Sequence, residues 1–154
     1  MKYLYLTIFT IVLISCDSTR VYEDYNDLED AFWQLDSIQT FQFEIEDTTK
    51  VYNLYATFRN ASGYPFYNLY FQYTLADSSQ NVIKQELREI NFFDPKTGEP
   101  KGSGIGDLFD HTYTLDVAYD FKAAGLYSIQ LQQFMRMDTL PYLLSVGARV
   151  ELVE

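Results

Sequence analysis

Cysteine and histidine are nearly absent from this chain, whose 154 residues include one of each, Cys16 and His111. A single cysteine excludes an intrachain disulfide and a redox dithiol. A single histidine makes any Ser-His-Asp triad depend on His111, and it leaves few ligands for a zinc site. His111 lies between Asp110 and Thr112 at a loop-to-strand boundary. We therefore expect a solvent-exposed turn histidine, no catalytic residue and no bound metal.

Basic residues are scarce as well, with 11 lysines and arginines against 22 aspartates and glutamates and a net charge of −11. Such an acidic chain has no basic patch to hold phosphates, so nucleic acid is not an expected partner. Anionic lipid headgroups would repel the same surface. Attachment to a membrane therefore has to come from something other than charge.

Long hydrophobic runs are missing too, because the apolar run at residues 3–14 is shorter than the roughly 20 residues of a membrane-spanning helix. The run follows Lys2 and ends in LISC at residues 13–16, which resembles the lipobox of bacterial lipoproteins. We expect cleavage before Cys16 and attachment of a diacylglycerol to its sulfur, and apart from this covalent lipid no cofactor is expected. The alternative is an ordinary secretory signal with a leftover cysteine.

Helical periodicity and internal repeats are absent, and alternation of apolar and polar residues recurs instead. The expected strands cover residues 41–45, 51–59, 68–75, 82–92, 112–119, 125–131 and 146–152. About seven short strands without helices between them indicate an all-β fold, an immunoglobulin-like or jelly-roll antiparallel β-sandwich. Gly125 and Tyr127 before an alternating strand are similar to the tyrosine corner of immunoglobulin-like sandwiches.

Two of these segments carry further detail. The alternation at residues 51–75 is the cleanest, and it predicts two strands that flank a turn at residues 60–65. In the segment 82–92, the apolar phase moves from Ile83 and Leu87 to Ile90 and Phe92, which we interpret as a bulge.

We divide the chain into a signal peptide (residues 1–15), a lipidated N-terminus with an acidic tether (16–36) and a β-sandwich domain (37–154). Removal of the signal takes Lys2 with it, so 11 basic residues become 10 against 22 acidic ones, a balance of −12. Trp33 is expected to dock on its own domain, and the alternative is that it anchors a partner.

Three groups of acidic or glycine residues are candidate sites. Glu44 and Glu46 share a strand face about 6.6 Å apart, a spacing that suits a glycosidase pair, but their alternation with apolar residues favours a solvated face. The glycines at residues 102–106 resemble a phosphate loop but have strand-like flanks, which favours hairpin glycines. The acidic residues nearby are candidate calcium ligands, but they lack EF-hand spacing. These are Asp94, Glu99, Asp107 and Asp110.

Aromatic residues are abundant, at 18% of the chain. Four of them, on the outer strand faces or near the turn, are candidate contacts for a partner protein or a glycan: Tyr55, Tyr64, Phe66 and Tyr70. Cross-strand packing within the domain is an equal alternative for these rings. Both alternatives remain open at this point.

Taken together with the lipobox, a series of short motifs resembles the gliding-motility lipoprotein GldH family of Bacteroidota over nearly the whole chain. In order, the motifs are RVY at 20–22, YNL at 52–54, RN at 59–60, YP at 64–65, NL at 68–69, GIGD at 104–107, GLY at 125–127, QFMR at 133–136 and VG at 146–147. Only Cys16 maps onto a functional position of the family, and no catalytic residue transfers.

The resemblance implies a lipid-anchored envelope protein that is needed for gliding and is linked to type IX secretion, with other gliding or secretion proteins as partners. Residues 17–20 lack the acidic run of a surface-export signal, so we expect the outer membrane, facing the periplasm. The predicted role is a non-enzymatic accessory or scaffold component. The main alternative is a glycan-binding module that uses exposed tyrosines, and the weakest is a carboxylate hydrolase.

Overall fold

The chain folds almost entirely into β-strands, as the alternation predicts, in a computed structural model that describes residues 19–153. The predicted signal peptide and Cys16 lie outside the described residues. Within residues 19–153 the helical content is one turn of 3-10 helix, η1 (Glu29–Ala31). That part of the chain contains no helix with the length and apolar character needed to cross a bilayer.

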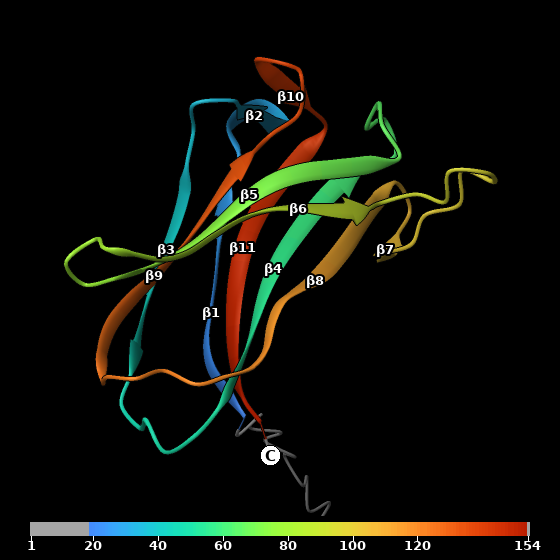
Figure 1. Cartoon of the computed structure of the whole chain (residues 1–154). Helices are drawn as coiled ribbons and strands as arrows, with labels where there is room; N and C mark the ends of the chain where they lie inside the picture. Colours follow the sequence, from blue (N-terminus) through green and yellow to red (C-terminus); the bar gives the residue numbers. More distant parts are fainter. Residues whose placement is uncertain (1–18, 154) are drawn as a thin grey trace, which may run out of the picture.

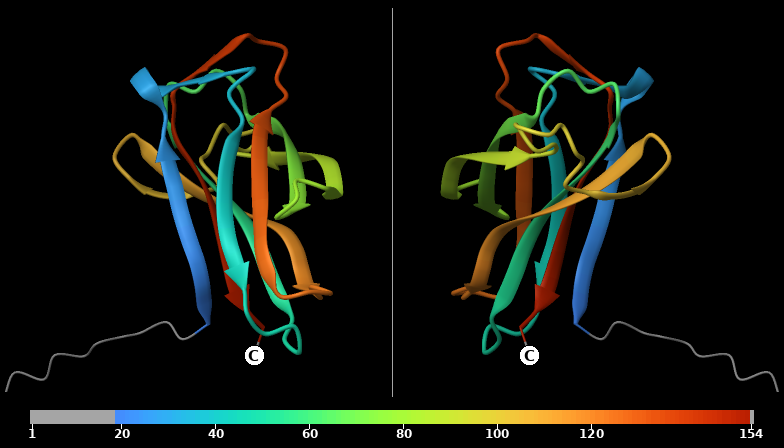
Figure 2. Two further views of the ribbon diagram at one scale, coloured as in Figure 1. Left: turned by 90° about the vertical axis from the view of Figure 1, so that its left-hand side faces the viewer. Right: turned by 90° about the vertical axis from the view of Figure 1, so that its right-hand side faces the viewer.

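The strands form two antiparallel sheets that pack face to face, with a small third sheet at one end (Figures 1 and 2). The first sheet has the order β1-β11-β4-β8-β7 and the second the order β3-β9-β5-β6, while β10 pairs with β2. In sequence order the strands are β1 (Arg20–Asp27), β2 (Phe32–Gln34), β3 (Gln39–Ile45), β4 (Tyr52–Ala61), β5 (Asn68–Asp77), β6 (Val82–Asn91), β7 (Ser103–Ile105), β8 (Leu108–Tyr119), β9 (Gly125–Gln133), β10 (Thr139–Pro141) and β11 (Leu143–Leu152).

Each of the seven predicted segments forms a strand, namely β3, β4, β5, β6, β8, β9 and β11. The other four strands are additional. Three of them, β2, β7 and β10, have three residues each, too few to show an alternating pattern. The fourth, β1, has a burial pattern that does not alternate, because most of its side chains face solvent.

β1 corrects the predicted boundary between tether and domain. Residues 20–27 were assigned to an acidic tether, but they pair in register with β11 from Glu151 to Ser145. Thr19 extends the pairing, since its carbonyl accepts a hydrogen bond from the Leu152 N–H at 2.7 Å. The backbone of β11 between β1 and β4 is thereby satisfied on both sides, which a solvated tether could not provide. The sandwich therefore begins at residue 19 rather than at residue 37.

Trp33 lies in the same N-terminal region and is fully buried, as expected for docking on its own domain. Its indole N–H donates to the Ser37 carbonyl at 2.8 Å. Leu140, opposite Trp33 in the β2–β10 ladder, is buried with it. The small sheet thus closes one end of the sandwich over the core, and Trp33 is not available as a partner anchor.

β4 and β5, the two strands predicted to flank a turn, do not pair with each other. β4 lies in the first sheet beside β11 and β8, and β5 lies in the second beside β6 and β9. The turn between them therefore crosses from one layer to the other. Both strands keep their alternation because each buries one face in the same core, so a sequence pattern cannot distinguish this arrangement from a hairpin.

Aromatic rings fill the space between the sheets. Phe58 of the first sheet meets Phe71 of the second with ring centroids 5.0 Å apart, and Phe92 packs against Phe58 at 5.9 Å. The hydroxyls of the buried tyrosines all have partners, as a buried tyrosine requires. Tyr52 donates to Asp47 O, Tyr64 to Asn68 O, Tyr73 to Asp116 Oδ2 and Tyr127 to Ala123 O, at 2.7–2.9 Å. The Tyr127 bond to a carbonyl four residues upstream is the geometry of the predicted tyrosine corner.

Candidate functional site

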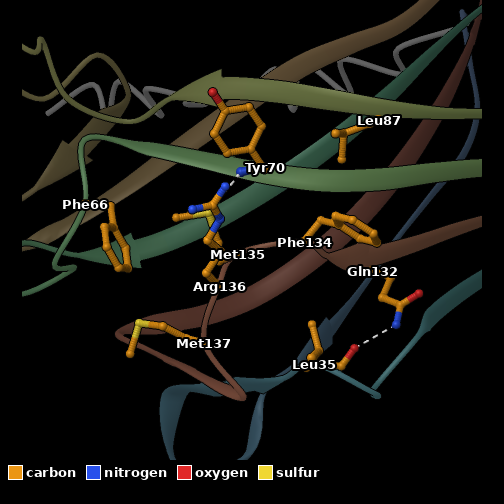
Figure 3. Close-up of a pocket in the computed structure, with 9 residues that line it drawn as sticks. All are labelled: Leu35, Phe66, Tyr70, Leu87, Gln132, Phe134, Met135, Arg136 and Met137. Carbon is orange, nitrogen blue, oxygen red and sulfur yellow. Dashed lines mark hydrogen bonds between the residues drawn. The ribbon is translucent and has the colours of Figure 1, made fainter.

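An apolar groove of about 930 Å³ lies on the outside of the second sheet, near the end that β2 and β10 close. Figure 3 shows its side chains arranged around a depression between β5, β9 and the segment that follows β9. The lining residues are Leu35, Phe66, Tyr70, Leu87, Gln132, Phe134, Met135, Arg136 and Met137. We call this site the apolar groove.

One wall of the apolar groove is formed by residues 134–137, an ordered segment that follows the end of β9 and that we call the excursion. The side chain of Gln133, fully buried, holds this excursion at two points. Its amide nitrogen donates to the Met137 carbonyl at 2.9 Å, and its amide oxygen accepts from the Met135 N–H at 2.8 Å. One buried amide therefore replaces the backbone partners that the excursion would otherwise lack.

Hydrogen bonds between elements fix the rest of the apolar groove. The Gln132 side chain donates to the Leu35 carbonyl at 2.7 Å, and the Leu35 N–H donates to the Asp138 carbonyl at 2.8 Å. The Phe134 N–H donates to the Tyr70 carbonyl at 2.8 Å. The groove is therefore preformed by the fold, because its three walls are joined through their backbones.

Large apolar side chains of the apolar groove are open to solvent. Leu87 is 58% exposed and Phe134 is 51% exposed, and Leu35, Tyr70 and Met137 are exposed as well. Contiguous exposed apolar surface on a folded protein is typical of an interaction site. Leu87 is opposite Gln72 in a ladder whose register runs without interruption from Lys84 to Asn91. The register irregularity within residues 82–92 lies instead at the start of β6, between Val82 and Lys84, and Leu87 is an apolar residue on the outer face of the strand.

Arg136 is the one charged residue among those that line the apolar groove. Within residues 19–153, Arg136 is the arginine without an ion pair, whereas Arg59, for example, binds Asp110 through two hydrogen bonds of 2.7 and 3.0 Å. Tyr70, at the rim, hydrogen-bonds Glu89, which raises the pKa of its phenol. The groove thus combines apolar walls with an uncompensated positive charge, on a chain that is strongly acidic.

The four predicted aromatic contacts do not form one surface. Phe66 and Tyr70 line the apolar groove. Tyr64 is buried in the core with its ring 5.1 Å from that of Phe92, so it cannot touch a partner of the folded protein. Tyr55 is half-buried on the outer face of the first sheet, where the Arg149 guanidinium lies 4.8 Å from its ring centroid.

His111 is not the exposed turn residue that was expected. It lies within β8, is 5% exposed and stacks on Phe92 with ring centroids 4.3 Å apart. A ring nitrogen lies 2.8 Å from the Asn60 side-chain oxygen. Burial lowers the pKa of His111 to about 4, although the charge of Asp110 acts in the opposite direction. The register of β8 against β4, which places residue 111 opposite Phe58, explains the burial.

The acidic candidates are dispersed. Asp94 accepts hydrogen bonds from the Lys96 and Thr97 N–H groups, which lowers the pKa of its carboxyl, while Asp110 binds Arg59. Within residues 19–153, no group of three or more acidic, histidine or cysteine side chains could hold a metal ion. Glu44 and Glu46 are exposed, as a solvated face requires. The glycines of residues 102–106 belong to the β7–β8 hairpin, where Gly106 takes a φ of +66°.

Of the residues that line the apolar groove, the sequence pattern pointed to Phe66 and Tyr70 alone. Two signals were present. Leu87 occupies the solvent phase of its strand, and residues 134–137 continue the apolar character of β9 beyond the point where its alternation ends. Apolar residues that do not fit the alternation of a strand were the sign of an exposed site.

The comparisons with known proteins agree on one family. The family described as GldH lipoprotein matches residues 20–150. The gliding motility lipoprotein GldH homolog of Christiangramia forsetii is 32% identical, with 96% of this chain and 93% of the relative covered. The gliding motility lipoprotein GldH of Flavobacterium johnsoniae is 31% identical, with 95% of this chain and 93% of the relative covered.

Among solved structures, a chain of infectious bursal disease virus (Gx strain) is similar at 8% identity and a TM-score of 0.36, covering 88% of this chain and 30% of the viral one. That likeness is too remote to bear on function. The family match and the two relatives span almost the whole chain and confirm the resemblance seen in the short motifs. The chain belongs to the GldH lipoprotein family, and its role as a membrane-anchored envelope protein is in gliding motility.

Proposed function

We propose that this protein is a non-enzymatic accessory component of the gliding apparatus, linked to type IX secretion, that acts by holding other envelope proteins. It is anchored through a lipid on Cys16 in the outer membrane and faces the periplasm. The observation that carries the proposal is the apolar groove, which presents exposed Leu87 and Phe134 on a rigid sandwich. Such a surface supplies binding free energy to a partner and offers no nucleophile or acid–base pair.

The first test replaces groove residues in the native gliding organism. The double variant Leu87→Gln and Phe134→Gln should fold, because both side chains are mostly solvent-exposed, but it should lose most of its colony spreading. The control is Val117→Gln, since Val117 is 73% exposed on β8 and lies outside the groove. Immunoblots must show equal amounts of each variant. Normal spreading of the double variant would refute the docking role.

The link to secretion and the absence of catalysis need separate measurements. A strain that lacks the protein should release less type IX cargo into the medium, and complementation should restore the release. Glu44→Gln should leave spreading and cargo release unchanged, because the proposed role uses no carboxylate chemistry. Unchanged cargo release in the deletion strain would break the link to secretion while leaving the role in gliding intact.

A glycan-binding function has one observation in its favour. The outer face of the first sheet holds a second hollow of about 410 Å³ whose lining includes Tyr25, Arg149 and Glu23. Tyr55 lies beside it under Arg149, so exposed rings and charged groups meet there as they do in sugar-binding sites. Titration of the protein with envelope polysaccharide, followed by tyrosine fluorescence, tests this alternative. A response that disappears in Tyr25→Ala would support it.

A further inference from the structure

We propose that the apolar groove receives a segment of a partner protein that carries apolar side chains and a carboxylate, with the carboxylate paired to Arg136. This inference rests on the proposed docking function and specifies its ligand. Three observations lead to it: the size and fixed shape of the groove, the single unpaired cation within it, and its position relative to the lipid attachment site.

The size and shape of the apolar groove suit a short peptide segment. Its volume of about 930 Å³ falls in the range of sites that enclose a compact ligand. The Gln133 amide and the Gln132–Leu35 bond fix the walls before a ligand arrives. Binding therefore does not have to order the groove, which lowers the entropic cost of association.

The charge of Arg136 favours partner segments that carry a carboxylate beside their apolar side chains. Arg136 lines the groove and has no ion pair within residues 19–153, although the chain has twice as many acidic as basic residues. A carboxylate on the incoming segment would be the natural partner for its guanidinium, which binds carboxylates through two parallel hydrogen bonds. A second copy of this chain fits poorly, because a symmetric contact through the groove would bring Arg136 against Arg136 in two acidic molecules.

The position of the apolar groove excludes the chain's own membrane and lipid as its occupant. Cys16 precedes Thr19 by three residues, so the Cα atom of Cys16 lies at most about 11 Å from that of Thr19, at the start of the sandwich. The start of β1 and the end of β11 lie together at one end of the molecule in both figures.

The groove lies toward the opposite end. The ring of Tyr22 in β1 is 5.9 Å from that of Phe43, which lies opposite Tyr127 in the first half of β9, so β9 starts at the anchored end. The nine residues of β9 then rise about 30 Å to Gln133, where the groove begins. The groove therefore faces away from the anchoring bilayer, toward proteins in the adjacent compartment.

The test is photocrosslinking in living cells of the native gliding organism, with the full-length protein and with p-benzoylphenylalanine at Phe134. We expect an adduct with a peptide of another envelope protein, identified by mass spectrometry, that contains apolar residues and an aspartate or glutamate. Arg136→Glu should reduce the adduct yield on the order of tenfold, because it replaces an attraction with a repulsion. Arg136→Lys should keep the yield within about twofold, since it keeps the charge.

A charge reversal on the partner completes the test. Replacing the partner's carboxylate with lysine should restore the adduct in the Arg136→Glu protein. The inference would be overturned by an adduct with phospholipid, with glycan or with a second copy of this chain, or by the absence of any adduct. It would also be overturned if Arg136→Glu left the adduct yield unchanged. If spreading is lost in the Leu87→Gln and Phe134→Gln variant while the Arg136 substitutions have no effect, the docking function stands and only the predicted ligand is wrong.

Discussion

The buried imidazole of His111 couples the stability of this protein to pH. In the folded chain, burial between Phe92 and Asn60 holds the pKa of His111 near 4, whereas the unfolded chain has an ordinary histidine pKa near 6.5. The unfolded state therefore binds the proton first as the pH falls. The stabilising effect of the neutral ring is complete above pH 6.5 and is lost progressively down to about pH 4.

We predict that a variant without this ring loses less stability in acid. Between pH 7 and pH 4.5, the free energy of unfolding of the wild type should fall by about 2–3 kcal/mol more than that of His111→Gln. The surface aspartates also weaken the fold in acid, because turn hydrogen bonds lower the pKa of Asp47 and of Asp77, but they are common to both proteins. Urea unfolding at the two pH values provides the measurement. An equal loss of unfolding free energy in the wild type and in His111→Gln would contradict the lowered pKa of His111.

Gln133 shows how one buried polar side chain shapes the apolar groove. Gln133→Leu would keep the size of the side chain but leave the Met137 carbonyl and the Met135 N–H without their partners. We predict a loss of about 1–3 kcal/mol of stability and faster proteolysis within residues 134–138. The matched control is Gln130→Leu on the outer face of the same strand, which should change stability little. Equal effects of the two substitutions would show that Gln133 does not hold the excursion.

At the scale of elements, β1 is the strand whose placement depends most on its neighbours. It contributes few core side chains, and it is held by the ladder to β11 and by the Tyr22 ring, which lies 5.9 Å from Phe43. The close approach of β1, β11 and β4 depends on Gly147. A Cβ at that position would lie 2.4 Å from Thr57 Oγ1 and 2.7 Å from the Asp24 carbonyl oxygen.

Gly147→Ala should therefore push β1 away from β11 and cost about 1–3 kcal/mol of stability. Thr57→Ala in the same protein should restore part of the loss, because it removes the nearer of the two clashes but leaves the Asp24 carbonyl. Ser145→Ala on the same strand is the control and should be nearly neutral. Thermal unfolding measures all three, and an unchanged midpoint for Gly147→Ala would mean that the strands are not packed this closely.

At the scale of the whole molecule, an acidic body and an expected lipid act in opposite directions. With 22 acidic residues against 10 basic ones after residue 15, the domain has no electrostatic attraction to anionic lipid. Cys16→Ser should therefore move the protein from the membrane fraction to the soluble envelope fraction and abolish labelling with radioactive palmitate. Spreading should fall with it. A variant that stays membrane-bound and labelled would disprove lipidation at Cys16.

Some features of this structure follow from the local sequence pattern, and others depend on tertiary contacts. The seven strands predicted from alternation are all present, because burying one face of a strand leaves a period of two in any sequence. The family resemblance was equally readable, since short motifs persist in order along the chain. Both kinds of information are contained in neighbouring residues.

The remaining features depend on residues far apart in the sequence. β1 is a strand because β11, more than 100 residues later, offers it an edge, and His111 is buried because Phe92 covers it. The apolar groove joins Leu35, Leu87 and Phe134, which have no relation in the sequence until three elements meet. The sequence alone determined the all-β class, the family and the candidate lipidation site. Contacts between residues far apart in the sequence decided where the domain begins, how His111 is buried and where the apolar groove lies.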